Sequence, residues 1–257
     1  MTTMPEFLVT PISSNSKTGP CPQVTIGHNV ETCRQSCLRA GCPLLPVKLG
    51  GPAENGGPTC YSWSGTGRLG LLSKMKGYLH AEVKGQAEDR YGLSALQHRL
   101  ASAKMIRISD IGDPCALSDT AVRALREAAA AANLFIVGFT HGWRQAPLWR
   151  GILMASVGSL DEADEAIDAG WRAAVVLPST WSPGDKTFRT PKGRRGVVCP
   201  SMIDKAKGRV TYELRRGKKV TVPATQCNSC LICREDWKPA VVGFPDHSAA
   251  ARGSAWR

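Results

Sequence analysis

The sequence predicts an α/β protein, in which a partial (β/α) barrel-like parallel sheet is followed by a C-terminal cysteine-rich module that binds a metal or cluster. Three observations predict this fold. Short apolar strands alternate with amphipathic helices over residues 105–177, ten cysteines fall into groups, and the composition turns basic after Trp181. We therefore expect an α/β domain with an N-terminal cysteine loop over 1–183, and a basic hairpin with the cysteine module over 184–257.

Hydrophobic spacing and turn residues predict the elements in order. Residues 11–58 are rich in Pro, Gly and Cys without a sustained period, which predicts an irregular loop. Apolar residues at helical spacing over 69–103 predict helices broken near Gly77 and Gly85. The pattern then predicts strands at 105–109, 134–140, 152–156 and 173–177, helices at 120–132 and 161–169, and a hairpin over 209–222. Strands that alternate with helices form a parallel sheet.

Polar residues follow the ends of these expected strands, where parallel sheets carry their chemistry. Asp113 and His141 are candidate catalytic residues, although a histidine at a strand end is more often structural. Gly112, Asp113, Thr140 and Ser156 are candidates for cofactor binding.

The C-terminal cysteines form the most specific motif. Cys227, Cys230 and Cys233 are spaced Cys-x2-Cys-x2-Cys. Cys199 lies earlier in the sequence, and the predicted hairpin separates it from these three cysteines. Such a run needs a tightly curled backbone to turn three thiolates toward one centre, to which Cys199 can add a fourth. Four thiolates bind a [4Fe–4S] cluster or a zinc ion. The spacing, which is similar to that of bacterial ferredoxins, favours the cluster and leaves zinc as the alternative.

A second set consists of Cys33, Cys37 and Cys60, with Cys42 as a further candidate ligand. Three thiolates leave one iron of a cubane open, and radical S-adenosylmethionine enzymes bind their cofactor at such an iron. The x3 spacing of those enzymes is present here, but twenty-two residues lie between Cys37 and Cys60. Cys42 could instead close the site as a fourth ligand.

The turn at Gly112-Asp113-Pro114 resembles the Gly-Gly-Glu-Pro turn that holds the methionyl amino group in radical S-adenosylmethionine enzymes. Gly-Asp-Pro is also an ordinary turn sequence. Combined with the upstream cysteines and the parallel-sheet pattern, the resemblance implies S-adenosylmethionine as a cofactor beside one of two [4Fe–4S] clusters.

Charge and hydropathy limit the kinds of partner that we expect. The formal net charge is +12, and residues 186–219 alone carry +10, which predicts DNA or RNA binding or a solvated basic hairpin. Aromatic residues are sparse there, so base stacking on single strands is not indicated. No apolar stretch is long enough to span a membrane. The first sixteen residues lack the pattern of a secretory signal, so we expect a cytoplasmic protein with reduced cysteines.

Eight phrases in order carry a closer resemblance. They are Asn15-Ser-Lys-Thr-Gly-Pro20, Thr32-Cys-Arg-Gln-Ser-Cys37, Cys60-Tyr61, Arg107-Ile-Ser-Asp-Ile-Gly-Asp113, Gly138-Phe-Thr-His141, Val197-Val-Cys-Pro200, Cys227-Asn-Ser-Cys-Leu-Ile-Cys233 and Val242-Gly-Phe-Pro-Asp-His247. The chain is similar over residues 15–248 to a family of phage- and plasmid-borne cysteine-rich proteins, the gene-eighty-eight-like proteins, a domain of unknown function. That family has proline where Arg34 stands and a shorter gap before its Cys-Tyr pair. The resemblance implies two cysteine sets, and a host-cell cytosol if the protein is phage-encoded.

Two functions follow as hypotheses. The first is an iron–sulfur enzyme with radical S-adenosylmethionine-like chemistry. Nucleic acid and nucleotides are among its candidate substrates. The second is a non-enzymatic nucleic-acid-binding protein whose iron–sulfur or zinc sites are structural. The sequence does not distinguish between them, and it does not predict the oligomeric state.

Overall fold

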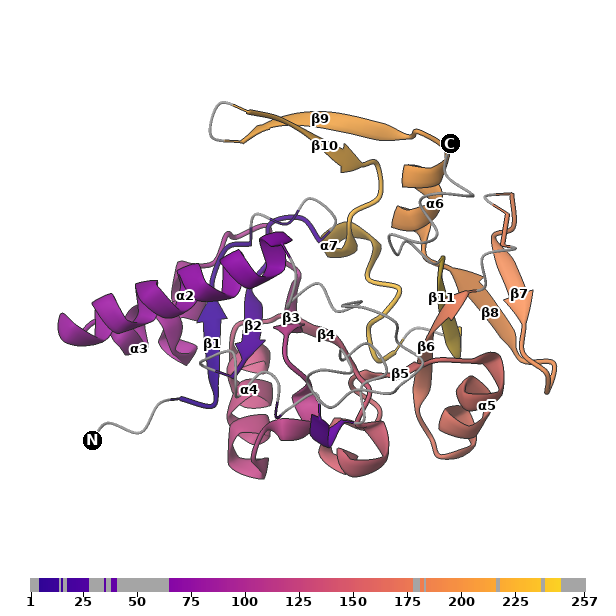
Figure 1. Cartoon of the computed structure of the whole chain (residues 1–257), viewed down its shortest axis with the longest axis horizontal. Coiled ribbons are helices and arrows are strands. Elements are labelled where there is room, and N and C mark those ends of the chain that lie inside the picture. Colours follow the sequence, from indigo (N-terminus) through magenta and orange to yellow (C-terminus); the bar gives the residue numbers. More distant parts are fainter. Residues whose placement is uncertain are drawn as a thin grey trace.

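The centre of the protein is a nine-stranded, mostly parallel sheet with the order β1-β2-β3-β4-β5-β6-β11-β8-β7 (Figure 1). A computed structural model describes residues 5–13, 15, 18–27, 35, 38–40, 65–177, 181–182, 184–215, 218–236 and 239–245. The strands are β1 (Phe7–Thr10), β2 (Gln23–Ile26), β3 (Met105–Ile111), β4 (Phe135–Thr140), β5 (Met154–Val157), β6 (Arg172–Leu177), β7 (Thr187–Arg189), β8 (Arg195–Val198) and β11 (Val241–Pro245).

Strands β2 to β6 follow one another in sequence order and run parallel, as expected for part of a (β/α) barrel wall. β11 is parallel to both β6 and β8 and lies between them. Antiparallel β1 and β7 form the two edges, so the barrel is not closed. The predicted α/β class and parallel sheet are confirmed, and the carboxyl ends of the parallel strands share one edge.

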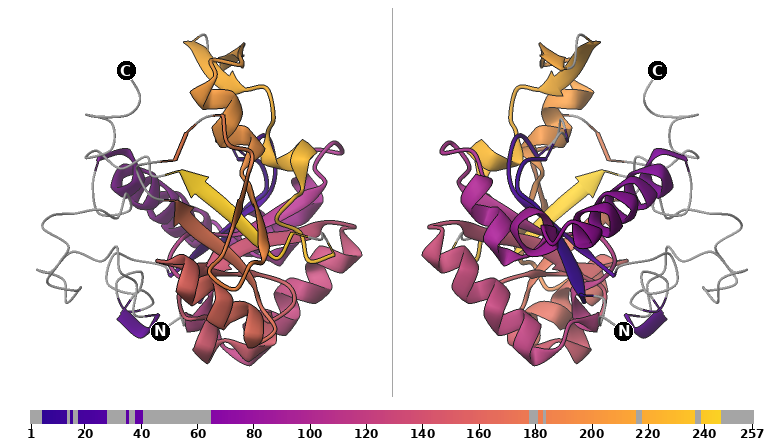
Figure 2. Two further views of the ribbon diagram at one scale, coloured as in Figure 1. Left: turned by 90° about the vertical axis from the view of Figure 1, so that its right-hand side faces the viewer. Right: turned by 90° about the vertical axis from the view of Figure 1, so that its left-hand side faces the viewer.

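The separate C-terminal module expected after residue 183 is not confirmed. β7, β8 and β11 join the same sheet as β1 to β6. Among the described residues, β9 (Val210–Arg215) and β10 (Lys218–Pro223) form a second sheet, the expected antiparallel hairpin. This ribbon stands away from the main sheet in every view (Figures 1 and 2).

The helices of the α/β core begin at serine caps. Ser118 accepts a hydrogen bond from the Ala121 N–H and starts α4 (Asp119–Ala131), and Ser159 does the same for Glu162 in α5 (Leu160–Asp168). Because the apolar residues of both helices recur at helical spacing, each buries one face against the sheet. α4 and α5 cover the same face of the sheet, and the opposite face receives the cysteines described below.

One long helix replaces the broken helices expected before residue 83. α2 (Gly65–Val83) runs without interruption through Gly77, and the break comes at Gly85, whose φ is +67°. A glycine inside a helix costs only about 1 kcal/mol relative to alanine. A Cβ at Gly77 would lie 2.2 Å from the Tyr91 hydroxyl, so this glycine serves the packing of α3 (Ala87–Tyr91) on α2.

Short strands and turns complete the description. The expected irregular loop over 11–58 contains β2, whose four residues are all buried. Three further helices are 3-10 turns on the core face, at Pro114–Ala116, Trp143–Gln145 and Pro147–Trp149, and a fourth is at Leu93–His98. Within the described residues, no helix is both long enough and apolar enough to cross a bilayer.

Candidate functional site

The Cys-x2-Cys-x2-Cys segment has the curled backbone that its spacing predicts. Cys227–Cys230 is one helical turn, α7, and the Leu231 N–H closes it by donating to the Cys227 carbonyl at 3.0 Å. Leu231 adopts the left-handed conformation, with φ of 54°. This reversal turns the chain so that Cys233 faces the same side as the cysteines of α7.

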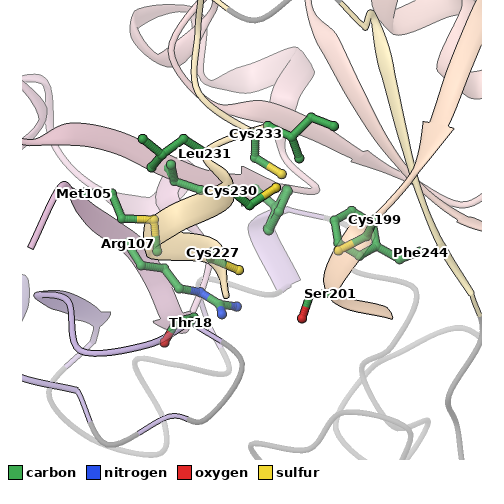
Figure 3. Close-up of a pocket in the computed structure, with 13 residues that line it drawn as sticks. Thr18, Met105, Arg107, Cys199, Ser201, Cys227, Cys230, Leu231, Cys233 and Phe244 are labelled. Atoms are coloured by element: carbon green, nitrogen blue, oxygen red, sulfur yellow. The ribbon is translucent and has the colours of Figure 1, made fainter. Parts of the chain in front are cut away.

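Cys199 comes to this segment from the other side of the site. It lies between the end of β8 and the start of α6 (Pro200–Ala206), and its N–H donates to the Gly243 carbonyl of β11 at 2.9 Å. Cys199, Cys227, Cys230 and Cys233 all line one cavity of about 50 Å³. Figure 3 shows the Cys199 and Cys227 sulfurs facing each other across it, with Cys230 and Cys233 along its upper side.

The cavity lies against the face of the sheet that α4 and α5 leave uncovered. Met105 of β3, Val137 and Phe139 of β4 and Phe244 of β11 form its apolar wall. Met154 of β5 packs in the same cluster as Cys199. The four cysteines therefore lie on the concave side of the parallel sheet.

Asn228 anchors α7 to the N-terminal half of the chain. Its N–H donates to the Thr18 carbonyl at 3.0 Å, and its side-chain amide donates to the Ser102 carbonyl at 3.1 Å. Its side-chain oxygen accepts from the Lys104 N–H at 2.8 Å, just before β3 begins. The second residue of the Cys-Asn-Ser-Cys motif thus fixes where the cysteines sit relative to the sheet.

Arg172, the first residue of β6, holds the loop that carries Cys233. Its guanidinium donates to the carbonyls of Ile232, Arg234 and Pro239, at 2.8 Å for Ile232 and at 3.1 and 3.2 Å for Pro239. Burial lowers the pKa of Arg172, and the nearby Cys233 and Asp236 oppose that change. Spacing gave no indication of this residue, because its contacts join segments about sixty residues apart.

Burial favours the neutral thiol form of Cys230 and Cys233. Burial raises the pKa of the Cys233 thiol, and the thiols of Cys199, Cys227 and Cys230 raise it further. Burial also raises the pKa of Cys230, with Cys199 as a further cause. A metal cation reverses this preference, because it binds the deprotonated sulfur.

Cys21 is a fifth thiol at the site, and its spacing did not predict it. It is fully buried and belongs to an apolar cluster against which Cys227 and Cys233 pack. Burial raises the pKa of Cys21 to about 11, although a hydrogen bond from Thr18 and the charge of Arg107 oppose the rise. Arg107 itself lines the cavity.

The N-terminal set of predicted metal ligands cannot be compared with the structure. Cys33, Cys37, Cys42 and Cys60 lie outside the described residues. The six cysteines within the described part of the chain are thiols without disulfide bonds. In that part, no three Cys, His, Asp or Glu side chains form a ready-made site for a metal ion.

The strand-end residues predicted from the sequence do come together. The Asp113 carboxylate accepts the Thr140 hydroxyl at 2.6 Å, the His141 N–H at 2.8 Å and the Cys115 N–H at 3.0 Å. Burial alone would raise the pKa of Asp113, but the contacts with His141, Thr140 and Cys115 outweigh it and lower the pKa. Asp113 therefore ties the end of β3 to the end of β4 as a carboxylate. The catalytic role expected for it stays a prediction.

His141 continues this network to the next strand. Its Nδ1 lies 3.6 Å from Asp113 Oδ2, and its Nε2 lies 3.1 Å from the Ser156 hydroxyl at the end of β5. A carboxylate beside one ring nitrogen and a hydroxyl at the other is an arrangement that can move a proton. Ser156 follows Met154 on the same face of β5, so this network and the cysteine cavity share the concave side.

Gly112 lies where β2 ends. Its φ is +81°, and a Cβ there would come within 2.4 Å of the Ile26 carbonyl oxygen, so only glycine allows this approach. The chain that carries Cys33, Cys37 and Cys60 leaves the sheet just after Ile26. Ala40 returns to the same edge, since a Cβ on Gly142 would lie 3.3 Å from its Cα.

A second polar cluster at this edge was not predicted. Lys74 of α2 forms an ion pair with Asp110 of β3 and donates to the Thr25 hydroxyl of β2 at 2.7 Å. Thr25 in turn donates to Asp110 at 2.6 Å. These contacts fix the position of α2, the helix that follows the cysteine-bearing segment, against β2 and β3.

The basic segment at 186–219 divides into two parts. In the β7–β8 hairpin, Arg194 pairs with Asp164 at 3.1 Å and also with Asp168, and Lys192 pairs with Asp168 at 2.5 Å. These contacts attach the hairpin to α5 and offset part of its positive charge. The hairpin also carries Arg189 and Arg195, and further basic residues belong to α6 and to the β9–β10 ribbon.

We expect Asp113→Asn to lower the free energy of unfolding by roughly 2–3 kcal/mol at neutral pH, because hydrogen bonds to a charged group are lost. The folded-state pKa of Asp113 is lowered, so its contribution is present above the unfolded value of about 4 and disappears as the pH falls through the folded value. Urea unfolding of both proteins between pH 3 and about pH 7 measures this, and the difference should shrink toward acid. A difference that is independent of pH would contradict an ionised Asp113.

Comparisons of the chain with protein-family models, with curated proteins and with solved structures found no match.

Proposed function

We propose that this chain is an iron–sulfur protein in which Cys199, Cys227, Cys230 and Cys233 hold a [4Fe–4S] cluster. One observation carries the proposal: cysteines from two separate segments line a single cavity on the concave side of the sheet. Thiolate sulfur is the ligand that iron–sulfur clusters and zinc share. Zinc at these four residues is the alternative, and sulfide analysis distinguishes it.

We further propose that the protein is an enzyme with radical S-adenosylmethionine-like chemistry at the carboxyl edge of the sheet. Strands β2 to β6 in sequence order support this proposal, together with the departure of the cysteine-bearing segment from Ile26, beside Gly112. In this proposal Cys33, Cys37 and Cys60 hold a second cluster with one open iron. When bound and reduced, that cluster supplies the electron that cleaves S-adenosylmethionine.

The chain's own residues have defined tasks in this chemistry. Gly112 keeps the turn after β3 close to the end of β2, so that backbone groups there can contact the cofactor's amino group. The Thr140 hydroxyl donates a hydrogen bond to the Asp113 carboxylate, and this contact holds the turn rigid. His141 and Ser156 form the proton-carrying pair nearest the concave face, where a substrate would lie.

Anaerobic purification followed by iron, zinc and sulfide quantitation tests the first proposal. A [4Fe–4S] cluster at the C-terminal cysteines requires iron and inorganic sulfide in equal amounts. Zinc without sulfide would replace the cluster by a structural zinc site. A protein that holds neither metal after anaerobic reconstitution would refute both versions.

Cys37→Ala is expected to abolish reductive cleavage of S-adenosylmethionine while leaving the C-terminal site loaded. The reason is that Cys37 belongs to the open set in the proposal, whereas the C-terminal cavity is lined by other residues. The measurement is formation of 5′-deoxyadenosine under a strong reductant, with iron counted per chain. Absence of cleavage in fully loaded wild-type protein would refute the enzymatic proposal and leave the C-terminal cluster unaffected.

A second candidate function, nucleic-acid binding, is favoured by one observation. The β9–β10 ribbon projects from the body and carries basic residues on both sides of its turn, at Arg215, Lys218 and Lys219. A two-stranded ribbon is among the elements that fit the major groove of B-form DNA. In the β7–β8 hairpin, by contrast, Lys192 and Arg194 are engaged in ion pairs with α5.

Lys218→Ala/Lys219→Ala is therefore expected to weaken binding to duplex DNA or RNA and to reduce the salt slope by about two, since each phosphate contact releases a counterion. Fluorescence anisotropy between low and physiological salt measures this. Lys192→Ala is the control and should change little. Equal effects from both variants, or no binding at low salt, would contradict the assignment to the ribbon.

A further inference from the structure

Two buried polar atoms at the cysteine cavity have no hydrogen-bond partner. They are Arg107 Nε and Ser201 Oγ, for which no partner exists among the described residues, thiol sulfurs included. Both residues line the cavity. Ser201 is 3% exposed, so bulk water does not solvate its hydroxyl. A buried donor without an acceptor costs about 1–3 kcal/mol, which makes two of them at one cavity a feature that needs an explanation.

The position of these donors indicates what the occupant must offer. Figure 3 shows the Arg107 guanidinium extending from β3 toward the space beside Cys227, with Ser201 across from it. Ser201 follows Cys199 by two residues in the first turn of α6. A metal ion held by four thiolates offers these donors only the ligand sulfurs as acceptors. A cluster adds inorganic sulfides, which carry lone pairs and negative charge.

Charge supports the same conclusion. Four thiolates around a [4Fe–4S] core leave a net negative charge in an apolar cavity, and an uncompensated buried charge is unfavourable. Arg107 lines the cavity, and Arg172 lies close enough to Cys233 to influence it. The guanidinium of Arg172 already donates to three backbone carbonyls. Arg107 Nε has no such acceptor and can donate to a group in the cavity.

We propose that Arg107 and Ser201 donate hydrogen bonds to the inorganic sulfides of the cluster held by Cys199, Cys227, Cys230 and Cys233, and thereby set its reduction potential. The inference rests on the proposed cluster at these cysteines. Hydrogen bonds and positive charge near the sulfurs stabilise the reduced, more negative state and raise the potential. Arg107 and Ser201 are positioning and tuning residues in this arrangement, and ligation is left to the four thiolates.

Redox titration of the cluster, followed by electron paramagnetic resonance, tests the proposal. The titrations use the Cys33→Ala/Cys37→Ala background, so that the N-terminal set does not contribute. Arg107→Met is expected to lower the ratio of reduced to oxidised cluster about tenfold at a fixed potential, which for one electron is a shift of about 59 mV to more negative values. Ser201→Ala should shift it in the same direction by less, and Arg107→Lys should recover part of the loss.

Arg126→Met is the matched control, since it removes the same charge from an exposed position on α4, on the other face of the sheet. Iron and sulfide counted on every variant separate the two proposals. Zinc without sulfide in the wild type refutes the cluster itself. If the fully loaded Arg107 and Ser201 variants have the same potential as Arg126→Met, the proposed hydrogen bonds are refuted and the proposed cluster is not. Should Arg107→Met lose its iron, Ser201→Ala still decides, because it removes a single oxygen atom.

Discussion

Cys230→Ala is expected to empty the C-terminal site and to make residues from about 205 to 240 sensitive to protease. Cys230 ends α7 and lines the cavity, so its loss removes one of the four ligands proposed for the cluster. The segment around it has few apolar residues of its own, and ordering costs roughly 1–2 kcal/mol per residue. Metal ligation should therefore be coupled to folding of this segment. β7, β8 and β11 belong to the main sheet, so they should resist cleavage.

Limited proteolysis with mass spectrometry, combined with metal counting, measures this effect. Cys21→Ala is the matched control, because Cys21 packs beside the site without being needed for a four-thiolate set. It should cost some stability and retain the metal. Cleavage spread over the whole chain in Cys230→Ala would mean that the site and the sheet unfold as one unit, and metal loss in Cys21→Ala would make Cys21 a ligand.

The second large effect is expected from Arg172→Leu. The substitution leaves the carbonyls of Ile232, Arg234 and Pro239 without their donor and frees the loop that carries Cys233. Hydrogen bonds from a charged group contribute about 1.5–3 kcal/mol each, so the combined loss should exceed about 3 kcal/mol. Urea unfolding should show this destabilisation, and metal affinity should fall with it.

Arg99→Leu separates loss of stability from loss of the site. Arg99 also donates to two backbone carbonyls, those of Leu96 and Ala132, but it is not among the residues that line the cysteine cavity. Its substitution should destabilise the fold with metal content unchanged. If Arg172→Leu likewise keeps its full metal content, the guanidinium does not position Cys233.

The repetitive part of the fold was predictable because its local patterns agree with its tertiary structure. The strands β3 to β6 and the helices α4 and α5 all lie within two residues of their expected bounds, since apolar periodicity and serine caps coincide there. β1, β2, β7, β8 and β11 are three to five residues long and carry too little periodicity to predict. The module boundary expected near residue 183 rested on the change to a basic composition, which does not indicate that β7, β8 and β11 join the main sheet.

The site shows a similar division. The cysteine spacing predicted the curled α7, and the strand ends predicted Asp113, Thr140 and His141 as candidates, which the structure brings into contact. Cys21, Arg107 and Arg172 were not predictable, because each reaches the cavity through a long-range contact that leaves no spacing in the sequence.

The place of β11 in the sheet has a consequence for the order in which the protein matures. β6 and β8 do not pair with each other, since β11 lies between them. During synthesis the amino-terminal strands can assemble early, whereas β8 gains its place only after residue 245 has been made. The cavity wall that Cys199 and Phe244 form is then also a late product of translation. Insertion of the proposed cluster should accordingly follow synthesis of β11, and a ribosome stalled before residue 241 should carry a chain unable to retain iron at the C-terminal cysteines.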